Sequence, residues 1–309
     1  MSLVIGNLPL KSRVLLAPMA GVSDLAFRLI VRKYAGVGLA CTEMISARAL
    51  HYNNKKTQEA LVTTPADSPL SVQIFGSEPD IMREAAEKVS GIADIIDINM
   101  GCPAKKIVKN GDGGALMLNL PLAQEIIKAV ITGAGGKPVT IKMRLGWDYD
   151  NLNAVTFAKS AQYYGAAAVV IHGRTVKQAY TGNADWSLIR EVAKSVDIPV
   201  VGNGSPYPEN LLQLCDDFGV AGVMVGRPAL GNPTLDGVIN FEAAHEHLTL
   251  IERYRPAKTG ILESRKHIIW YLKRAHAPSN LRNAAALAVN FDEMRRILDD
   301  ARDISNLGC

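Results

Sequence analysis

Eight short apolar runs, separated by longer amphipathic stretches, dominate roughly the first 230 residues of this 309-residue chain. The runs are rich in β-branched residues and are bounded by Gly, Pro or Asp, a pattern typical of strands buried on both faces of a parallel sheet. They cover residues 14–19, 39–44, 69–75, 94–99, 139–143, 168–172, 199–203 and 221–226.

The stretches between these runs have the apolar spacing of amphipathic helices. They lie at residues 23–34, 78–89, 121–132, 151–165, 186–196 and 208–219. Asp24 and Asp80 fall in first turns, where the helix dipole favours acids, and Gly165 and Gly219 fall at helix ends. Repeated alternation of strand and helix predicts an α/β protein with a (β/α)8 TIM barrel. A doubly wound sheet, with a different strand order, is the alternative fold.

The pattern changes near residue 240, after which no strand-like run occurs. Four helices are expected, at residues 243–255, 259–276, 280–288 and 291–304. A lone barrel needs only about 250 residues. We therefore expect a catalytic barrel over residues 1–242 and a small all-helical domain over residues 243–309.

Positive charge is concentrated in the helical segment. The whole chain carries +4, whereas residues 251–282 hold eight Lys or Arg against two Glu, a net +6. Tyr254, His267, Trp270 and Tyr271 are interleaved with these cations. A basic surface with aromatic rings suits phosphate contacts and base stacking in RNA. The alternative is a solvated helix face with Trp270 and Tyr271 in a core.

Several classes of protein are disfavoured by the sequence. The start of the chain lacks a basic segment followed by a long apolar one, and no apolar stretch reaches about 18 residues. We expect a cytoplasmic protein with no membrane contact. The four cysteines form no CxxC pair, which argues against a zinc ribbon or a disulfide framework. No metal site is expected, and His245 and His247 are interpreted as residues of a helix surface.

Nearly every apolar run carries, or is followed by, polar residues or residues of a turn. In a (β/α)8 barrel the carboxyl ends of the strands form the active site, so these residues are expected to converge there. They are Pro18, Met19 and Ala20; Thr42 and Glu43; Gln73; Asn99 and Cys102; Lys142 and Arg144; His172 and Arg174; Asn203 and Gly204; and Gly226 and Arg227.

Three of these features indicate chemistry. Burying Lys142 in a strand is costly without an anionic partner, which suggests a bound anion or an electron-rich ring. The segments 202–204 and 225–227 are rich in glycine and end the last two strands, where barrels often bind phosphate. Cys102 lies in a loop between Gly101 and Pro103, where a thiol can act as a general acid or, if activated, as a nucleophile.

Together these motifs resemble the tRNA-dihydrouridine synthases, and most of all their bacterial B-type subgroup. The similarity rests on LLAPMAGVSDLAFR, DINMGCPAKK, VTIKMRLGW, VIHGRT, VVGNG, VMVGRPALGNP and SRKHIIWYLK, which occur in order along nearly the whole chain. The resemblance implies a barrel that binds FMN, a helical domain that binds tRNA, and NADPH as the reductant of particular uridines. A monomer is expected.

Carried over by motif, the resemblance also implies residue roles. Cys102 would be the proton donor. Substrate contacts would come from Asn99, Arg144, Arg174 and Lys266. FMN contacts would come from Pro18, Met19, Ala20, Gln73, Lys142 and His172, and from Asn203, Gly204, Ser205, Gly226 and Arg227 around its phosphate.

Two positions depart from the family pattern. Ser205 replaces a frequent Asp after the Asn-Gly of the seventh strand, and Gly114 stands where another small residue is common. Two other functions stay open from the residues alone. One is a flavin enzyme on the same barrel that acts on free dihydropyrimidines or dihydroorotate, and the other is a tRNA-binding protein with an idle barrel.

Overall fold

The computed structural model describes residues 2–204 and 211–307. The chain divides into two compact units, which we describe separately. The first contains residues 1–24 and 37–225, and the second contains residues 25–36 and 226–309. Within the described residues, no helix is long and apolar enough to cross a membrane.

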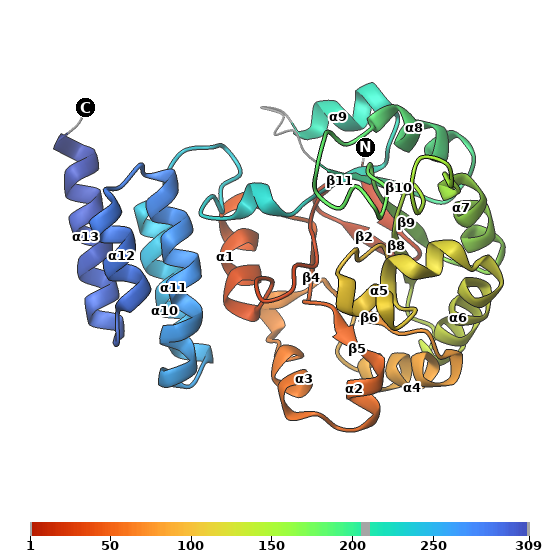
Figure 1. Ribbon diagram of the computed structural model, residues 1–309, viewed down its shortest axis with the longest axis horizontal. Coiled ribbons are helices and arrows are strands. Elements are labelled where there is room, and N and C mark those ends of the chain that lie inside the picture. Colours follow the sequence, from red (N-terminus) through yellow and green to blue (C-terminus); the bar gives the residue numbers. More distant parts are fainter. Residues whose placement is uncertain (1, 205–210, 308–309) are drawn as a thin grey trace. The chain divides into compact units, whose positions relative to one another are not determined.

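The first unit is a closed barrel of parallel strands (Figure 1). Its strands are β3 (Val14–Leu16), β4 (Leu39–Cys41), β6 (Leu70–Phe75), β7 (Ile95–Met100), β8 (Val139–Arg144), β9 (Ala168–His172), β10 (Val200–Asn203) and β11 (Gly222–Val225). β11 pairs with β3, and β4 pairs with both β3 and β6, so the ring closes. A short β5 (Ile45–Ser46) also pairs with β6. The predicted (β/α)8 barrel is confirmed, and the doubly wound sheet is wrong.

Helices alternate with these strands. They are α2 (Ala47–His51), α3 (Lys55–Ala60), α4 (Pro79–Val89), α5 (Lys105–Lys109), α6 (Leu120–Gly133), α7 (Ala154–Tyr163), α8 (Trp186–Lys194) and α9 (Leu211–Phe218). Side chains cap several of them: Asn119 accepts from the Leu122 N–H at 3.1 Å, and Asp185 accepts from the Leu188 N–H at 3.0 Å. Such caps satisfy amide groups that have no partner within the helix.

An antiparallel hairpin that the sequence patterns did not predict closes one end of the barrel. It consists of β1 (Leu3–Ile5) and β2 (Leu8–Leu10). Leu3, Ile5 and Leu10 are buried in one cluster with residues that line the barrel, including Leu15 and Leu39. At the hairpin turn, a β-carbon on Gly6 would lie 3.0 Å from the ring of Pro138, which immediately precedes β8. The hairpin therefore covers the amino ends of the strands, and the carboxyl ends are left for the site.

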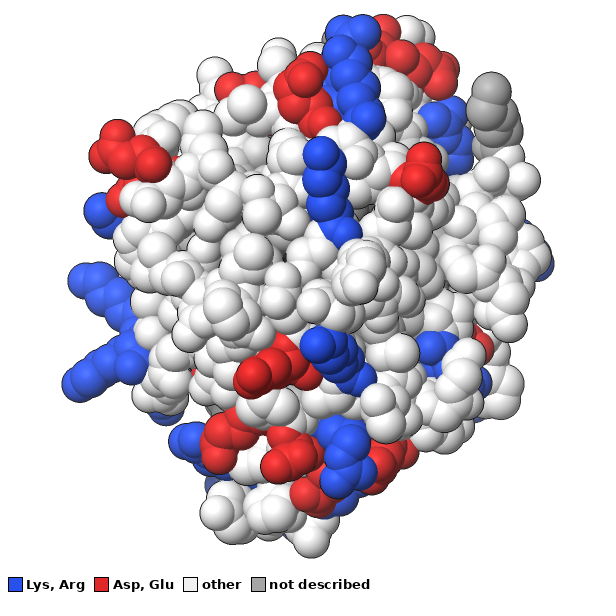
Figure 2. Space-filling view, turned by 90° about the vertical axis from the view of Figure 1, so that its right-hand side faces the viewer, with Lys and Arg blue, Asp and Glu red and all other residues white. Residues whose placement is uncertain are grey.

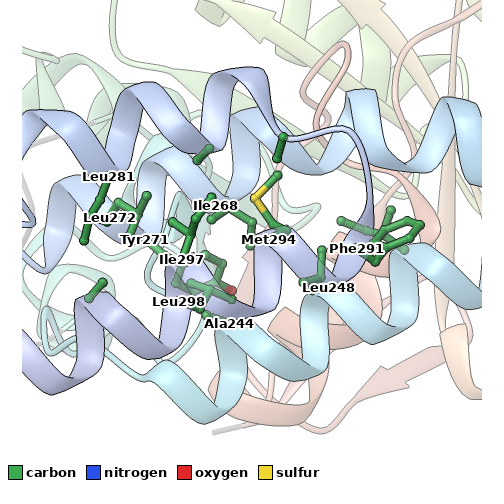
Figure 3. Packing of buried hydrophobic residues seen from close by; sticks show 14 of the residues in the cluster. Ala244, Leu248, Ile268, Tyr271, Leu272, Leu281, Phe291, Met294, Ile297 and Leu298 are labelled. Atoms are coloured by element: carbon green, nitrogen blue, oxygen red, sulfur yellow. The ribbon is translucent and has the colours of Figure 1, made fainter.

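All regular structure in the described part of the second unit is helical. It contains α1 (Leu25–Ala35), α10 (Phe241–Tyr254), α11 (Ala257–Arg274), α12 (Ser279–Leu287), α13 (Phe291–Leu307) and the short 3-10 helix η3 (Arg227–Ala229). Leu248, Ile268, Met294 and Leu298 meet in its core, which Figure 3 shows from close by. The four predicted C-terminal helices are confirmed within a few residues.

Helix α1 belongs to this helical unit, although in the sequence it connects the first two barrel strands. Its contacts with α10 are specific. Lys33 Nζ donates to Glu246 at 2.6 Å, Tyr34 donates to the same carboxylate at 3.1 Å, and the Phe27 ring lies 5.8 Å from that of His247. His247 is fully buried, so its interpretation as a helix-surface residue is wrong.

Candidate active site

One part of the barrel interior is polar. Gln73, Asp97, Asn99 and Thr140 are all buried, and Lys142 is half-buried. They come from the neighbouring strands β6, β7 and β8, and alternate residues of a strand face the same side. The strand register pairs Gln73 with Asp97, Asp97 with Thr140, and Asn99 with Lys142. The chain thus builds two adjacent polar layers across these three strands.

A continuous line of hydrogen bonds joins these layers. Thr140 Oγ1 donates to Asp97 Oδ1 at 2.5 Å, and Gln73 Nε2 donates to Asp97 Oδ2 at 2.6 Å. Asn99 Nδ2 then donates to Gln73 Oε1 at 2.8 Å. Both oxygens of the buried Asp97 carboxylate are therefore bonded, as burial of a charge requires.

The line of hydrogen bonds ends at the loop that carries Cys102. Asn99 Oδ1 accepts from the backbone N–H groups of Gly101 and Cys102 at 3.1 and 3.0 Å. Gly114 N–H donates to the Cys102 carbonyl at 3.0 Å, and a β-carbon on Gly114 would lie 2.9 Å from that oxygen. Glycine at position 114 therefore lets the backbone pack against the Cys102 loop. Cys102 itself is a free thiol of intermediate exposure.

Lys142 supplies a cation beside this loop. Its Nζ donates to Asn203 Oδ1 at 3.0 Å, and Asn203 Nδ2 donates to the Met224 carbonyl at 2.7 Å. Burial is the main cause that lowers the pKa of Lys142 to about 8, the charge of Arg144 adds to the shift, and the charge of Asp97 opposes it. Burial likewise raises the pKa of Asp97 to about 6, against the hydrogen bonds from Thr140 and Gln73.

Arg144 holds two loops at the carboxyl ends of the strands. Its guanidinium is buried and donates to the carbonyls of Gly101, Thr175 and Ala179 at 2.7, 2.8 and 2.6 Å. It also lies 5.6 Å from the ring centre of Tyr180, a side chain that is 57% exposed. Arg144 therefore ties the Cys102 loop to the loop that follows β9.

Arg174 also binds the loop that follows β9. It donates to the carbonyls of Thr181 and Gly182, the shortest of these bonds being 2.6 Å, and its Nη1 lies 3.1 Å from His172 Nε2. Arginine has only donors, so His172 Nε2 accepts and the ring proton is assigned to Nδ1.

Gly204 follows β10 next to His172. Its φ of +127° lies in the region that favours glycine, and a β-carbon there would lie 2.5 Å from that of Ala184. The position therefore requires glycine. Ser205, its predicted partner in holding phosphate, lies outside the described residues.

The loop after β3 is fixed by a serine. Ser23 Oγ donates to the Ala17 carbonyl at 3.0 Å and accepts from Met19 N–H at 2.9 Å. Glu43, which follows β4, accepts from the Gly21 N–H. These bonds hold Pro18, Met19 and Ala20 as an ordered segment of the first unit.

Three predicted site residues lie in the second unit. Gly226 and Arg227 directly follow β11, and Arg227 begins η3. Lys266 lies on α11 and is half-buried.

Half of the basic residues in the +6 segment have structural partners in the helical unit. Arg265 donates to the Ala288 carbonyl at 2.8 Å, Arg274 to the Gly237 carbonyl at 3.1 Å, and Arg282 to the Ala277 carbonyl. Arg255 pairs with Glu263 at 2.9 Å. Arg253, Lys258 and Lys273 are exposed instead. Some cations of this segment therefore hold the helices together, and others form a positively charged surface.

Asp97, Thr140 and Tyr180 were missed by the sequence reasoning. Asp97 stands two residues before Asn99, and Thr140 two before Lys142, so the two-residue repeat of a strand could have placed them on the same side as the predicted residues. Tyr180 lies in a loop without any such repeat, and we find no sequence pattern that would have identified it.

Comparison with known proteins gives a consistent family. The family model described as "Dihydrouridine synthase (Dus)" matches residues 15–305. A probable tRNA-dihydrouridine synthase 1 of Synechocystis sp. is 38% identical over 99% of this chain and 90% of its own length. The tRNA-dihydrouridine synthase B of Pseudomonas aeruginosa is 39% identical over 87% of this chain and 86% of its own length.

Solved structures with a similar fold are more distant in sequence. Morphinone reductase in complex with tetrahydroNAD aligns with a TM-score of 0.54 at 14% identity, covering 76% of this chain and 88% of that one. An old yellow enzyme homologue from Zymomonas mobilis gives the same score and identity, covering 76% of this chain and 90% of its own. At these identities the likeness concerns the fold.

Proposed function

Because this chain belongs to the dihydrouridine synthase family, we propose that it reduces the C5–C6 double bond of particular uridines in tRNA, with FMN as bound cofactor and NADPH as reductant. The match to a B-type relative, over 87% of this chain and 86% of the relative, supports a B-type enzyme. A monomer in the cytoplasm, where tRNA is found, completes the proposal.

The observation that carries the proposal is a partly exposed free thiol held over a polar barrel interior. Two backbone N–H groups of the Cys102 loop are bonded to Asn99, and Arg144 holds the Gly101 carbonyl. A thiol fixed in this way can protonate a carbon atom of a ring that enters the barrel mouth. We assign Cys102 as the proton donor to C5 of uracil.

Residues of the barrel fit a flavin. Lys142 is a cation enclosed among strands, His172 offers a donor at Nδ1, and Gly204 requires the absence of a side chain beside them. Reduced FMN, when bound, would supply the hydride for C6. Lys142 would offset negative charge on the flavin, as buried cations do in sites where charge develops. Pro18, Met19, Ala20 and Gln73 are proposed as further contacts.

The phosphate of FMN needs donors at the end of β10. Within the described part of the first unit, Gly204 and the neighbouring Asn203 are the candidates for binding this phosphate. Ser205, Gly226 and Arg227 remain predictions from the motif.

The predicted substrate residues acquire different tasks. Asn99 is proposed to contact the uracil edge. The guanidiniums of Arg144 and Arg174 bind backbone carbonyls, so their proposed role is to hold the walls of the site around the base. Lys266, with the exposed Lys258 and Lys273, is proposed to contact tRNA phosphates.

A uridine within folded tRNA must leave its stack to reach such a site. The second unit, with its basic segment, is proposed to hold the tRNA while this happens. The side of the barrel that carries α6 and α7 is mostly uncharged, with acidic and basic residues interspersed (Figure 2). That side lacks the continuous positive surface that phosphate binding requires.

A substrate comparison tests the proposal. The purified protein with NADPH is given tRNA lacking dihydrouridine, free uracil, or orotate as the oxidised partner of dihydroorotate, and products are measured by mass spectrometry. We expect dihydrouridine in tRNA and no turnover of the free bases. Turnover of a free base alone would identify a dihydropyrimidine enzyme, and tRNA binding without any product would indicate an idle barrel.

A further inference from the structure

We infer that Asp97 is a positioning residue of this reaction, which fixes the loop of Cys102 and the direction of the Asn99 amide through Gln73. This inference rests on the proposed function. Asp97 lies at the level of the barrel farther from the mouth, one side-chain layer below Asn99 on the same strand. It reaches the Cys102 loop only through the two amides between them.

The chemistry of a carboxylate determines the direction of each bond in this line. An ionised carboxylate only accepts hydrogen bonds, so Gln73 must present its NH2 group to Asp97. Gln73 then presents its oxygen to Asn99, which must donate. The Asn99 oxygen is thereby left for the backbone N–H groups that follow it.

The reverse orientation is unfavourable at each step. A flipped Gln73 would place its oxygen against the Asp97 carboxylate and its NH2 against that of Asn99. A flipped Asn99 would place an NH2 against two N–H groups of the Cys102 loop. Like groups facing each other in a buried site lose their bonds and leave unsatisfied polar atoms. The Asp97 carboxylate and the two backbone N–H groups of the Cys102 loop therefore favour the same arrangement from opposite ends of the line.

The position argues against a purely structural role. Other strands, β3, β4 and β10, fill the same barrel with Leu15, Leu39 and Val201, which need no partners. A buried carboxylate disfavours folding unless its charge is compensated, and burial here raises its pKa. The charged group facing Asp97 is Lys142 of β8, while Thr140 and Gln73 contact it as neutral donors. A carboxylate that is costly at this position is better explained by its orientation of the site.

The arrangement also defines what Asn99 can offer to a substrate. Its oxygen already accepts two hydrogen bonds, and one of its hydrogens is given to Gln73. Its nitrogen is 3.8 Å from the Met44 sulfur, a weak acceptor. Asn99 therefore meets the base as a donor, and its partner must be a carbonyl oxygen of uracil.

Four variants test this inference. Asp97→Ala removes the acceptor. Asp97→Asn keeps the shape, and its amide oxygen can still accept from Gln73 if the Thr140 hydroxyl turns to accept from the new NH2. Thr140→Val is the matched control, since it removes a bond from the same carboxylate on the side away from Cys102. The double variant D97N/T140V leaves that NH2 without an acceptor unless the amide line reverses.

The measured quantity is the rate at which tRNA reoxidises the flavin of NADPH-reduced holoenzyme in a single turnover. We expect this rate to fall at least about tenfold in Asp97→Ala. In each of D97N and T140V the rate should stay within about threefold of the wild-type rate. D97N/T140V should fall about tenfold below the product of the two single effects. A double variant equal to that product, or an Asp97→Ala variant within threefold of wild type, would overturn the inference.

A second readout needs no tRNA and separates this inference from the proposed function. The rate of Cys102 alkylation by N-ethylmaleimide, followed by peptide mass spectrometry, reports whether the loop is held. It should rise several-fold in D97N/T140V and stay unchanged in T140V. If wild type makes no dihydrouridine but the alkylation rates follow this pattern, the proposed function fails and the positioning role of Asp97 stands. Equal alkylation rates in wild type and all four variants contradict the role directly.

Discussion

Replacing Lys142 by Met should stabilise the flavin-free protein while damaging its function. The two side chains have similar length, but Met carries no charge into the barrel. Burial lowers the pKa of Lys142 from 10.5 to about 8, which means that the folded protein binds this proton less tightly than the unfolded chain does. The charge therefore disfavours folding at neutral pH.

The size of the effect follows from this pKa. A shift of one pKa unit corresponds to about 1.4 kcal/mol, so the charge costs roughly 3 kcal/mol. Partial hydration of the half-buried Lys142 side chain reduces that cost. The Lys142→Met variant also loses the bond to Asn203, which lowers its gain in unfolding free energy by about 1 kcal/mol. A net gain of about 1–2 kcal/mol remains. For a unit of this size it corresponds to a rise in Tm of roughly 2–8 °C.

The pH dependence gives the sign of the effect. The cost is complete below the folded pKa of about 8 and disappears as pH rises toward 10.5, where the unfolded chain also loses the proton. The advantage of Lys142→Met should thus be full at pH 7 and smaller at pH 9.5. Thermal unfolding of flavin-free wild type, Lys142→Met and the exposed control Lys137→Met measures it. A Lys142→Met variant less stable than wild type at pH 7 would contradict a destabilising charge at this position.

Other predictions concern single steps. Cys102→Ala should retain FMN and NADPH oxidation but form dihydrouridine about 100-fold more slowly or worse, by mass spectrometry of digested tRNA; full product yield would remove Cys102 as the acid. Gly204→Ala should strain the end of β10 by about 1–3 kcal/mol and release FMN, seen as lost visible absorbance. Asp97→Asn should raise Tm at pH 8, where wild type buries a charge, and lose this advantage toward pH 4, because the folded pKa of about 6 lies above 3.8. Lys258→Gln with Lys273→Gln should weaken tRNA binding and flatten its salt dependence, by titration at several salt concentrations.

The sequence predicted the barrel because its strands are buried on both faces and appear as compact apolar runs. The strand β7 was expected at residues 94–99 and lies at Ile95–Met100. The β1–β2 hairpin was missed because each of its strands has three residues, too few for a two-residue repeat to be distinctive. Helix α1 was predicted, but its place in the helical unit depends on contacts with residues more than 200 positions away, such as Glu246.

The same limit applies to the site. The motifs identified Asn99, Cys102 and Lys142, because a polar group at a strand end is conspicuous. They did not reveal that Asp97 sets the direction of the amides, since this depends on the strand register that brings Gln73 and Thr140 to its two oxygens. Register is a property of the closed sheet and is not written in any one segment.

Measuring dihydrouridine itself is the most direct test that this protein reduces uridines in tRNA. Purified protein, NADPH and tRNA from a strain unable to make dihydrouridine are incubated, and the digested nucleosides are examined by mass spectrometry beside a Cys102→Ala control. We expect a uridine product that is heavier by two hydrogens, depends on NADPH and occurs at defined tRNA positions, and we expect much less of it from the Cys102→Ala control. Unchanged tRNA from the wild-type reaction, with FMN bound and reduced by NADPH, would contradict it.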